Sequence, residues 1–186
     1  MASKADIRKQ MRELKRAVPP EEKLRRSDLI MERVALLPEF VKAEVVLLYW
    51  SMADEVQTHA FVEQWYSKKT LLLPCVDGDN LRLRRYTGHE CMVSGEQFGI
   101  GEPDAAIPEW TDLDAVQLIV VPGVAFDRQN NRMGRGRGFY DRLLKSTPKA
   151  VKVGVAYSFQ MLNEIPVEPF DVKMDLVISE PQTLNS

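Results

Sequence analysis

The sequence predicts an α/β fold with a mostly parallel central sheet that helices cover on both faces. Short apolar runs recur along the chain, and segments with helical spacing lie between them. The first of these runs, residues 45–49, is flanked by charge, which is typical of a strand buried on both sides. Strand and helix patterns that alternate in this way predict parallel strands joined by crossover helices.

Two helices are predicted before the first strand. Ser3 and Asp6 have the spacing of a capping box, so the first helix should begin near Lys4. Pro19-Pro20, followed by two glutamates, predicts the start of a second helix that ends near residue 37. The first helix also carries basic residues at three- and four-residue intervals, and this periodicity alone favours a solvent-exposed stripe. The stripe consists of Lys4, Arg8, Arg12 and Lys15.

Five apolar runs predict the strands of the sheet. They are residues 45–49, 70–73, 116–121, 151–156 and 176–178. A helical pattern over residues 58–68 separates the first two strands, and a further helix should begin near Tyr140. These segments supply the alternation that the fold class requires.

Residues 81–86 are the exception to the parallel pattern. Leucines alternate with arginines there, directly after the turn-forming residues 77–80, which predicts an antiparallel hairpin at the sheet edge. Residues 99–108 contain two prolines and predict an irregular connection. With no internal repeat or linker, we expect residues 1–186 to form a single domain.

Composition limits the function. The formal charge is −2 and the isoelectric point is near 5.8, which argues against a surface built to bind nucleic acid. Cys75 and Cys91 form neither a disulfide framework nor a zinc motif, and no segment resembles a signal peptide or a membrane span. We expect a cytoplasmic monomer whose partners are small molecules, with no nucleic acid or membrane among them.

The most distinctive segment follows a buried strand and alternates three glycines with two arginines. We call residues 134–138 the glycine-arginine loop. Residues 128–142 contain five arginines and one aspartate, so the local charge is +4 and the rest of the chain carries −6. Because glycine leaves backbone amides uncovered and arginine supplies positive charge, the loop suits a polyphosphate.

The loop matches neither of two common nucleotide motifs. It comes after several strands, whereas a dinucleotide-binding glycine motif follows the first strand, and it lacks the Gly-Lys-Ser/Thr of a P-loop. It is better described as an anion nest that leads into a helix N-terminus at Phe139 or Tyr140. A non-enzymatic RNA-binding module and a small-molecule kinase remain alternatives at this point.

Residues 122–127 and 132–142 resemble the signature of the 5-formyltetrahydrofolate cyclo-ligase family. Shorter likenesses follow in the family's order and extend over nearly the whole chain, at residues 4–8, 50–58, 98–103, 156–160 and 171–175. Two positions depart from the pattern, since Phe139 replaces the usual tyrosine and Gly101 replaces a common proline. The resemblance implies a three-layer α/β/α sandwich, in agreement with the predicted alternation.

The resemblance also implies an activity. The family converts 5-formyltetrahydrofolate and ATP to 5,10-methenyltetrahydrofolate, ADP and phosphate, with Mg²⁺ as cofactor. In the implied mechanism the formyl oxygen is first phosphorylated, and N10 then closes the ring as phosphate leaves. Positioning and charge neutralisation would dominate such a phosphoryl transfer.

The resemblance assigns roles to individual residues. The catalytic residues would be Arg135 and Arg137. ATP would be bound by Lys4, Arg8, Arg132, Gly134, Arg135, Gly136, Arg137, Gly138, Phe139 and Tyr140. The folate substrate would be bound by Trp50, Glu55 and Phe98 together with Arg135, Gly136, Arg137, Gly138 and Phe139. Asp141 and Asp175 would bind Mg²⁺.

Several of these assignments have a plainer alternative. Asp141 could be an acid at a helix N-terminus, Asp175 an acid at a strand edge and Glu55 an exposed acid. Trp50 and Phe98 could belong to the core. His59 and His89 lie in no metal-binding or nucleophile pattern, so we expect surface or packing roles for both.

Overall fold

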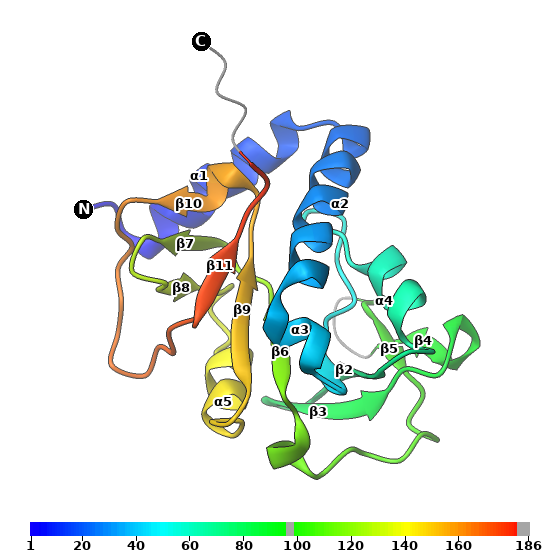
Figure 1. The fold of residues 1–186 in the computed structure, drawn as a ribbon. Coiled ribbons are helices and arrows are strands. Elements are labelled where there is room, and N and C mark those ends of the chain that lie inside the picture. The colour runs from blue at the N-terminus through cyan, green and yellow to red at the C-terminus, as the bar shows by residue number, and fades with distance from the viewer. Residues whose placement is uncertain (96–98, 182–186) are drawn as a thin grey trace.

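A computed structural model describes residues 1–95 and 99–181. Its centre is a six-stranded sheet in the order β11-β9-β6-β1-β2-β3 (Figure 1). The strands are β1 (Val45–Leu47), β2 (Thr70–Asp77), β3 (Asn80–Arg85), β6 (Leu118–Val121), β9 (Val151–Val155) and β11 (Leu176–Ile178). Neighbouring strands run parallel except β2 and β3, which form an antiparallel hairpin at the edge. The predicted sheet and its edge hairpin are both confirmed.

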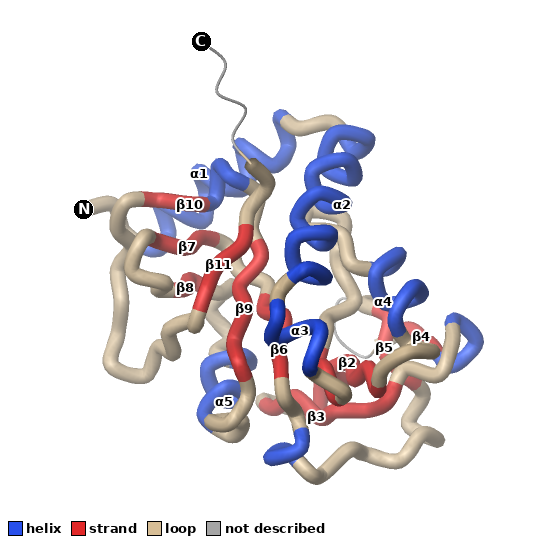
Figure 2. The backbone as a smooth tube through the Cα atoms, viewed as in Figure 1, coloured by secondary structure: helices blue, strands red, loops and turns tan. Residues whose placement is uncertain are grey.

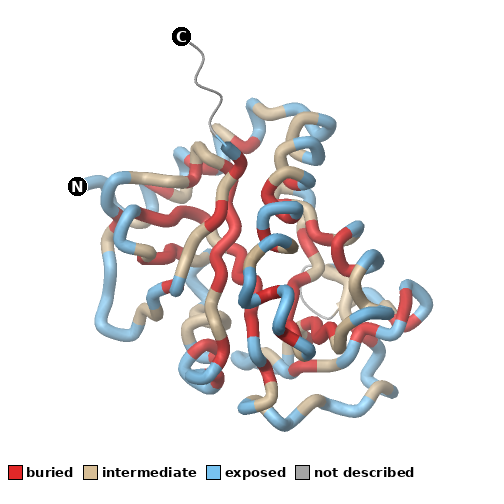
Figure 3. The backbone as a smooth tube through the Cα atoms, in the orientation of Figure 1, coloured by how far each residue is buried: buried red, intermediate tan, exposed pale blue. Residues whose placement is uncertain are grey.

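Helices cover the two faces of this sheet. The helices α2 (Pro20–Leu36), α3 (Pro38–Lys42) and α4 (His59–Trp65) pack on one face, and α5 (Phe139–Lys145) packs on the other. Val46 and Leu47 are adjacent in β1 and therefore point to opposite faces, Val46 toward α2 and Leu47 toward α5. Burial is accordingly greatest along the central strands (Figure 3). The three-layer α/β/α arrangement is confirmed.

The first helix, α1 (Lys4–Ala17), packs on a second, smaller sheet. Ile7 and Met11 of α1 contact Ala125 and Met133, and the capping box between Ser3 and Asp6 is present as predicted. The small sheet has the order β10-β7-β8, with β7 (Ala125–Asp127), β8 (Arg132–Met133) and β10 (Met161–Leu162). This sheet was not predicted, and it holds α1 beside the loop that follows β8.

One predicted connection contains a strand. Residues 99–108 were expected to be irregular, but β5 (Gly101–Pro103) pairs with β4 (Met92–Ser94). The remaining short elements are the 3₁₀ helices η1 (His89–Cys91), η2 (Leu113–Ala115) and η3 (Ser158–Gln160). Residues 163–175 contain no helix or strand and form a long connection between β10 and β11 (Figure 2).

Two further expectations concern cysteines and membrane spans. Cys75 and Cys91 are buried free thiols. Within residues 1–95 and 99–181, no helix combines the length and the apolar character needed to cross a membrane.

Candidate active site

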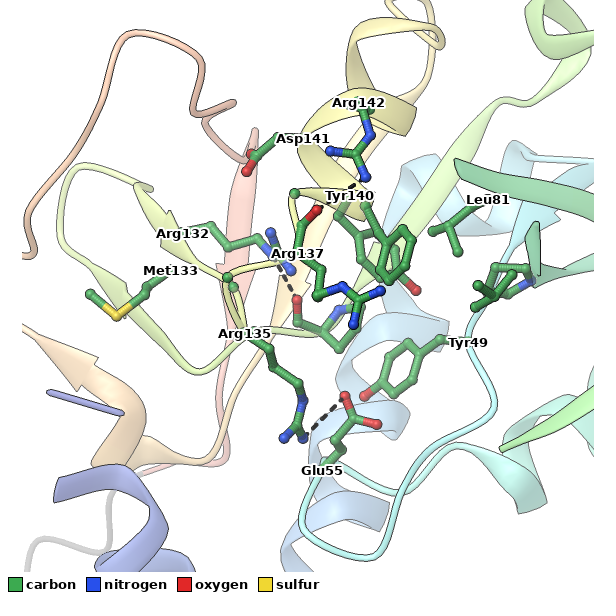
Figure 4. Close-up of a pocket in the computed structure, with 18 of the residues that line it drawn as sticks. Tyr49, Glu55, Leu81, Arg132, Met133, Arg135, Arg137, Tyr140, Asp141 and Arg142 are labelled. Carbon is green, nitrogen blue, oxygen red and sulfur yellow. Dashed lines mark hydrogen bonds and ion pairs between the residues drawn. The ribbon is translucent and has the colours of Figure 1, made fainter. Parts of the chain in front are cut away.

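A pocket of about 940 Å³ lies at the carboxyl ends of β1 and β6. Tyr49 and Trp50 line it just after β1, and Pro122 lines it just after β6. In open α/β sheets, ligands bind at this edge. The glycine-arginine loop, with Arg135 and Arg137, lines the pocket from the opposite side (Figure 4). Lys4 and Arg8 of α1 also line it.

The backbone of the glycine-arginine loop requires glycine at two positions. Gly136 has φ of 107° and Gly138 has φ of 70°, which are conformations that residues with a Cβ rarely adopt. Gly138 is the N-cap of α5, so this helix begins at Phe139 as predicted. The loop therefore keeps its backbone uncovered toward the pocket.

Arg132 lies beneath this loop and is buried, with 8% of its surface exposed. Its Nε donates a 2.6 Å hydrogen bond to the carbonyl oxygen of Pro122, and its guanidinium lies 5.1 Å from the centre of the Tyr140 ring. Burial lowers the pKa of Arg132 and raises that of Tyr140. Both residues line the pocket, and their mutual contacts hold the start of the loop in place.

Lys4 and Arg8 reach the pocket from α1. Nε of Arg8 donates a 3.1 Å hydrogen bond to the carbonyl oxygen of Gly134, so α1 is tied directly to the glycine-arginine loop. Nζ of Lys4 lies 2.9 Å from Oε1 of Glu168 and 3.7 Å from Oδ2 of Asp171. The two cations thus connect three segments that are far apart in the sequence.

The other two residues of the basic stripe differ in their exposure to solvent. Arg12 is exposed, as the periodicity predicted, but Lys15 is buried with 5% of its surface exposed. The prediction of a solvent-exposed stripe is therefore wrong at Lys15. Lys15 follows Arg8 by seven residues and so lies on the same side of the helix, facing the protein interior.

Charged groups gather at the base of the pocket. Nη2 of Arg135 donates hydrogen bonds of 2.9 and 3.2 Å to the two carboxylate oxygens of Asp54, and lies 4.0 Å from Oε2 of Glu55. Oδ2 of Asp54 lies 4.0 Å from Nζ of Lys15. Burial raises the pKa of Asp54, but the charges of Lys15 and Arg135 outweigh it, so the pKa lies below its ordinary value.

Glu55 is largely shielded from solvent, contrary to the alternative of an exposed acid. Its side chain is 11% exposed, and Oε1 accepts a 2.8 Å hydrogen bond from the amide of Met52. Burial raises its pKa, while the Met52 amide and the charge of Arg135 act in the opposite direction. A desolvated carboxylate aimed at a pocket is suited to binding a ligand that donates hydrogen bonds.

The far end of the pocket is apolar. Trp50 lines it, and its indole is stacked on the imidazole of His59 with ring centroids 3.7 Å apart and planes at 13°. Other residues at this end are Pro74, Val76, Leu81 and Ile100. His59 thus has the packing role that the sequence predicted. Phe98, the other predicted aromatic contact, lies outside the described residues.

Arg137 and Phe139 line the centre of the pocket with a further arginine, Arg142. The guanidinium groups of Arg137 and Arg142 lie 5.3 and 5.6 Å from the centre of the Phe139 ring. Arg142 also donates a 3.0 Å hydrogen bond to the carbonyl oxygen of Arg137 and another to that of Asp79. Because Phe139 has no hydroxyl, its contribution here is the face of its ring.

The two predicted magnesium ligands occupy different surroundings. Asp141 lines the pocket, and Oδ1 accepts a 3.2 Å hydrogen bond from the amide of Val172. Asp175 is not among the pocket residues, and Oδ2 accepts a 2.7 Å hydrogen bond from the amide of Lys152. Across residues 1–95 and 99–181, no group of three or more His, Cys, Asp or Glu side chains is placed to hold a metal. Magnesium needs only one or two carboxylates when phosphate oxygens are present, so Asp141 fits the role of a magnesium ligand in the pocket. The geometry gives no such support to Asp175, which is not among the residues that line the pocket.

Sequence reasoning assigned no role to three charged residues that line the pocket or are connected to its lining residues through ion pairs. Asp54 directly precedes Glu55, and this pair of adjacent acids is the sequence signal that could have identified Asp54. Lys15 shares a helix face with Arg8, but periodicity alone did not reveal what packs on that face. Arg142 was recognised as part of the basic segment, with no role in the pocket assigned.

The central sheet, the pocket at its carboxyl edge and the cationic loop beside it define an α/β enzyme. The chain belongs to the 5-formyltetrahydrofolate cyclo-ligase family, whose model matches residues 1–180, and the enzyme is therefore a ligase. The family resemblance noted in the sequence is confirmed.

Similar proteins cover nearly the whole chain. The 5-formyltetrahydrofolate cyclo-ligase of Escherichia coli K12 is 29% identical over 91% of this chain and 96% of its own length. The mouse protein of the same name is 27% identical over 96% of this chain and 94% of its own. The solution structure of 5,10-methenyltetrahydrofolate synthetase from Aquifex aeolicus is 37% identical, with a TM-score of 0.85, over 95% of this chain and 89% of its own.

Proposed function

We propose that this protein uses ATP to convert 5-formyltetrahydrofolate to 5,10-methenyltetrahydrofolate, with release of ADP and phosphate. The observation that carries the proposal is the position of the glycine-arginine loop in the pocket. In Figure 4, Arg135 and Arg137 lie between Met133 on one side and Tyr49 and Leu81 on the other. A phosphoryl group passing between two substrates would meet both arginines there.

The chemistry explains why ATP is required. A formamide oxygen is a poor leaving group, so attack of N10 on the formyl carbon stalls unless that oxygen is first activated. Attack of the formyl oxygen on the γ-phosphorus forms an O–P bond and releases ADP, which gives an imidate phosphate. N10 then forms a bond to the same carbon, and the C–O bond breaks as phosphate leaves.

Arg135 and Arg137 would act as the catalytic residues. During phosphoryl transfer, negative charge is spread over the equatorial oxygens of the phosphoryl group. Fixed cations beside these oxygens stabilise the transition state more than the ground state. Both arginines belong to a loop whose backbone Arg8 and Arg132 hold in place, so movement of the arginine side chains would be enough to bring them to the phosphoryl group.

The nucleotide would lie toward α1. Lys4 and Arg8 would bind phosphate oxygens from one side, and the backbone amides of Gly134, Gly136 and Gly138 would bind them from the other. Arg132, Phe139 and Tyr140 would shape this part of the site. Mg²⁺ bound by Asp141 would neutralise charge on the triphosphate.

The folate would lie toward the apolar end. Trp50 would form part of an apolar wall for the pterin ring, and Glu55 would accept hydrogen bonds from its amino-pyrimidine edge. Arg135 to Phe139 would contact the formyl group, and we expect a contribution to folate binding from Phe98, which lies outside the described residues. We further expect a single-domain monomer in the cytoplasm that acts on small molecules and binds neither nucleic acid nor membrane.

Near-ultraviolet absorbance tests the proposal directly. The purified protein should generate the methenyl chromophore when it is incubated with 5-formyltetrahydrofolate, ATP and Mg²⁺, and omission of ATP should prevent this. ATP consumption without the chromophore would instead indicate a small-molecule kinase. Neither signal from folded protein would reject the proposed function.

A further inference from the structure

Lys15 is a buried cation that the proposed reaction does not use. Its side chain is 6% exposed, and its ammonium faces the charged groups at the base of the pocket. Among the ion pairs of the described residues, its partner is Asp54 at 4.0 Å. Burial lowers the pKa of Lys15, while the charges of Asp54 and Glu55 act to raise it. Desolvating an ammonium is costly, so its place here requires compensation by these acids.

Asp54 is shared between two cations. It accepts both hydrogen bonds from Nη2 of Arg135 on the pocket side, and Lys15 approaches Oδ2 from the side of α1. Lys15 is far more buried than Arg135, since their side chains are 6% and 47% exposed. Arg135 can therefore turn into the pocket, whereas Lys15 is confined by packing.

This arrangement poses an electrostatic problem for the proposed reaction. In the structure Arg135 is bound to Asp54, but to contact a phosphoryl group it must release at least part of that pair. Asp54 would then be left beside Glu55, a second carboxylate in a partly desolvated site. An unpaired charge next to a like charge is costly, so Asp54 would pull Arg135 back unless another cation replaced it.

We propose that Lys15 is a positioning residue that keeps Asp54 paired when Arg135 turns from Asp54 to an anionic substrate. The identity of that anion as ATP rests on the proposed function. Lys15 contacts no reacting atom in this scheme and acts through Asp54 on the availability of Arg135. A purely structural role for Lys15 would change protein stability without linking Asp54 to ligand affinity.

Titration calorimetry with ATP tests this inference through a double-mutant cycle. Lys15→Met should weaken ATP binding about tenfold, because Asp54 then retains Arg135. Asp54→Asn should strengthen binding, because Arg135 is released. Once Asp54 is replaced, Lys15→Met should have an effect of less than about threefold, so the two substitutions should not be additive. Lys9→Met is the matched control, since Lys9 is an exposed lysine on the same helix, and it should leave the affinity unchanged.

Several results would overturn the inference. Equal ATP affinity of the wild type and a folded Lys15→Met variant would exclude it, as would strictly additive effects in the cycle or no heat with wild-type protein. If Lys15→Met fails to fold, the Asp54→Asn variant still tests the inference by itself. The scheme expects this variant to bind ATP more tightly, so weaker binding would contradict it. Lys15→Arg should retain at least a third of the wild-type affinity, since it keeps the charge.

The inference and the proposed function fail in different ways. Binding of ATP with the expected coupling, but without the methenyl chromophore in the wild type, would reject the function and retain the positioning role. If the wild type generates the chromophore but the Lys15→Met variant binds ATP with wild-type affinity, the positioning role is rejected and the function is retained.

Discussion

Gly101 lies directly against the indole of Trp50. A Cβ placed on Gly101 would come within 2.9 Å of Cδ1 and 3.0 Å of Nε1 of that ring, closer than real Cβ atoms approach other atoms. The same indole is stacked on the imidazole of His59. The commoner proline at this position in the family would bring the same Cβ, so this close approach depends on the glycine. The ring that we assign to pterin binding is thus in contact with both Gly101 and His59.

We predict that Gly101→Ala raises the folate KM several-fold while the ATP KM stays within about twofold. The added methyl group would overlap the indole, so the ring must shift, and the shift would disturb its stack on His59. Steady-state kinetics with each substrate varied in turn measures both constants. Ser94→Ala on the partner strand β4, where Ser94 is exposed, serves as the control. A change confined to the ATP KM would contradict the placement of folate beside Trp50.

Arg135→Ala should lower kcat by about a hundredfold or more, because it removes a cation from the transferring phosphoryl group. Arg128→Ala is the matched control, since Arg128 is an exposed arginine of the same basic segment that does not line the pocket. Single-turnover measurements should place the loss in the chemical step. A folded Arg135→Ala variant with a wild-type rate would remove this arginine from the mechanism.

Gly136→Ala should destabilise the protein by about 1–2 kcal/mol and weaken ATP binding. The cause is backbone strain at φ of 107°, because the added Cβ would make only an ordinary 3.6 Å contact with Arg8. Gly78→Ala provides the control, since Gly78 also has positive φ but lies in the β2–β3 turn with open space around it. It should lower stability similarly and leave ATP binding unchanged. Chemical denaturation and calorimetry separate the two effects, and equal losses of ATP affinity would point to unfolding alone.

Gly136→Val adds bulk to the same strain and should abolish measurable ATP binding. Its branched side chain would occupy the space that we assign to phosphate oxygens. Calorimetry on the folded variant checks this, and retained affinity would mean that the phosphates lie elsewhere.

Glu55→Gln should stabilise the protein at neutral pH while raising the folate KM. Burial raises the pKa of Glu55 above its ordinary value of 4.5, so ionisation lowers stability as the pH rises from the unfolded-state pKa, and the loss is complete above the folded-state pKa. The amide keeps an acceptor for Met52 and removes the buried charge, a gain on the order of 1 kcal/mol. Because Glu55 is protonated in both the folded and the unfolded state below its unfolded-state pKa, the stability gained by Glu55→Gln should vanish at about pH 4. Unfolding free energies at the two pH values test this, and a gain that persists in acid would implicate packing.

The sequence predicted the large elements because each carries many residues in one pattern. The apolar runs of β1, β6 and β9 had to lie in a doubly covered sheet, and the hairpin of β2 and β3 followed from alternation after a turn. The small sheet escaped prediction because two or three residues, as in β8, cannot display a period.

The site was predictable where the sequence itself carries the chemistry. Alternating glycine and arginine indicated an anion site, and the positive φ of Gly136 and Gly138 supplies the structural reason for glycine. Lys15 could not be placed, because helical periodicity gives the direction of a side chain but not the charges that it meets. The carboxylates of Asp54 and Glu55 come from a different segment and meet Lys15 only in the folded chain.

Asp141→Asn should weaken the magnesium dependence of turnover, whereas Asp175→Asn should lower stability and leave that dependence within about twofold. Asp141 lines the pocket beside the glycine-arginine loop, where ATP phosphates would complete the coordination of the ion. Asp175 accepts a hydrogen bond from the amide of Lys152 between β9 and β11, so its loss would disturb the edge of the sheet. Magnesium titration of activity and thermal unfolding distinguish the two outcomes. Should Asp175→Asn shift the magnesium midpoint as strongly as Asp141→Asn does, the ion must be held nearer β11 than the pocket geometry indicates.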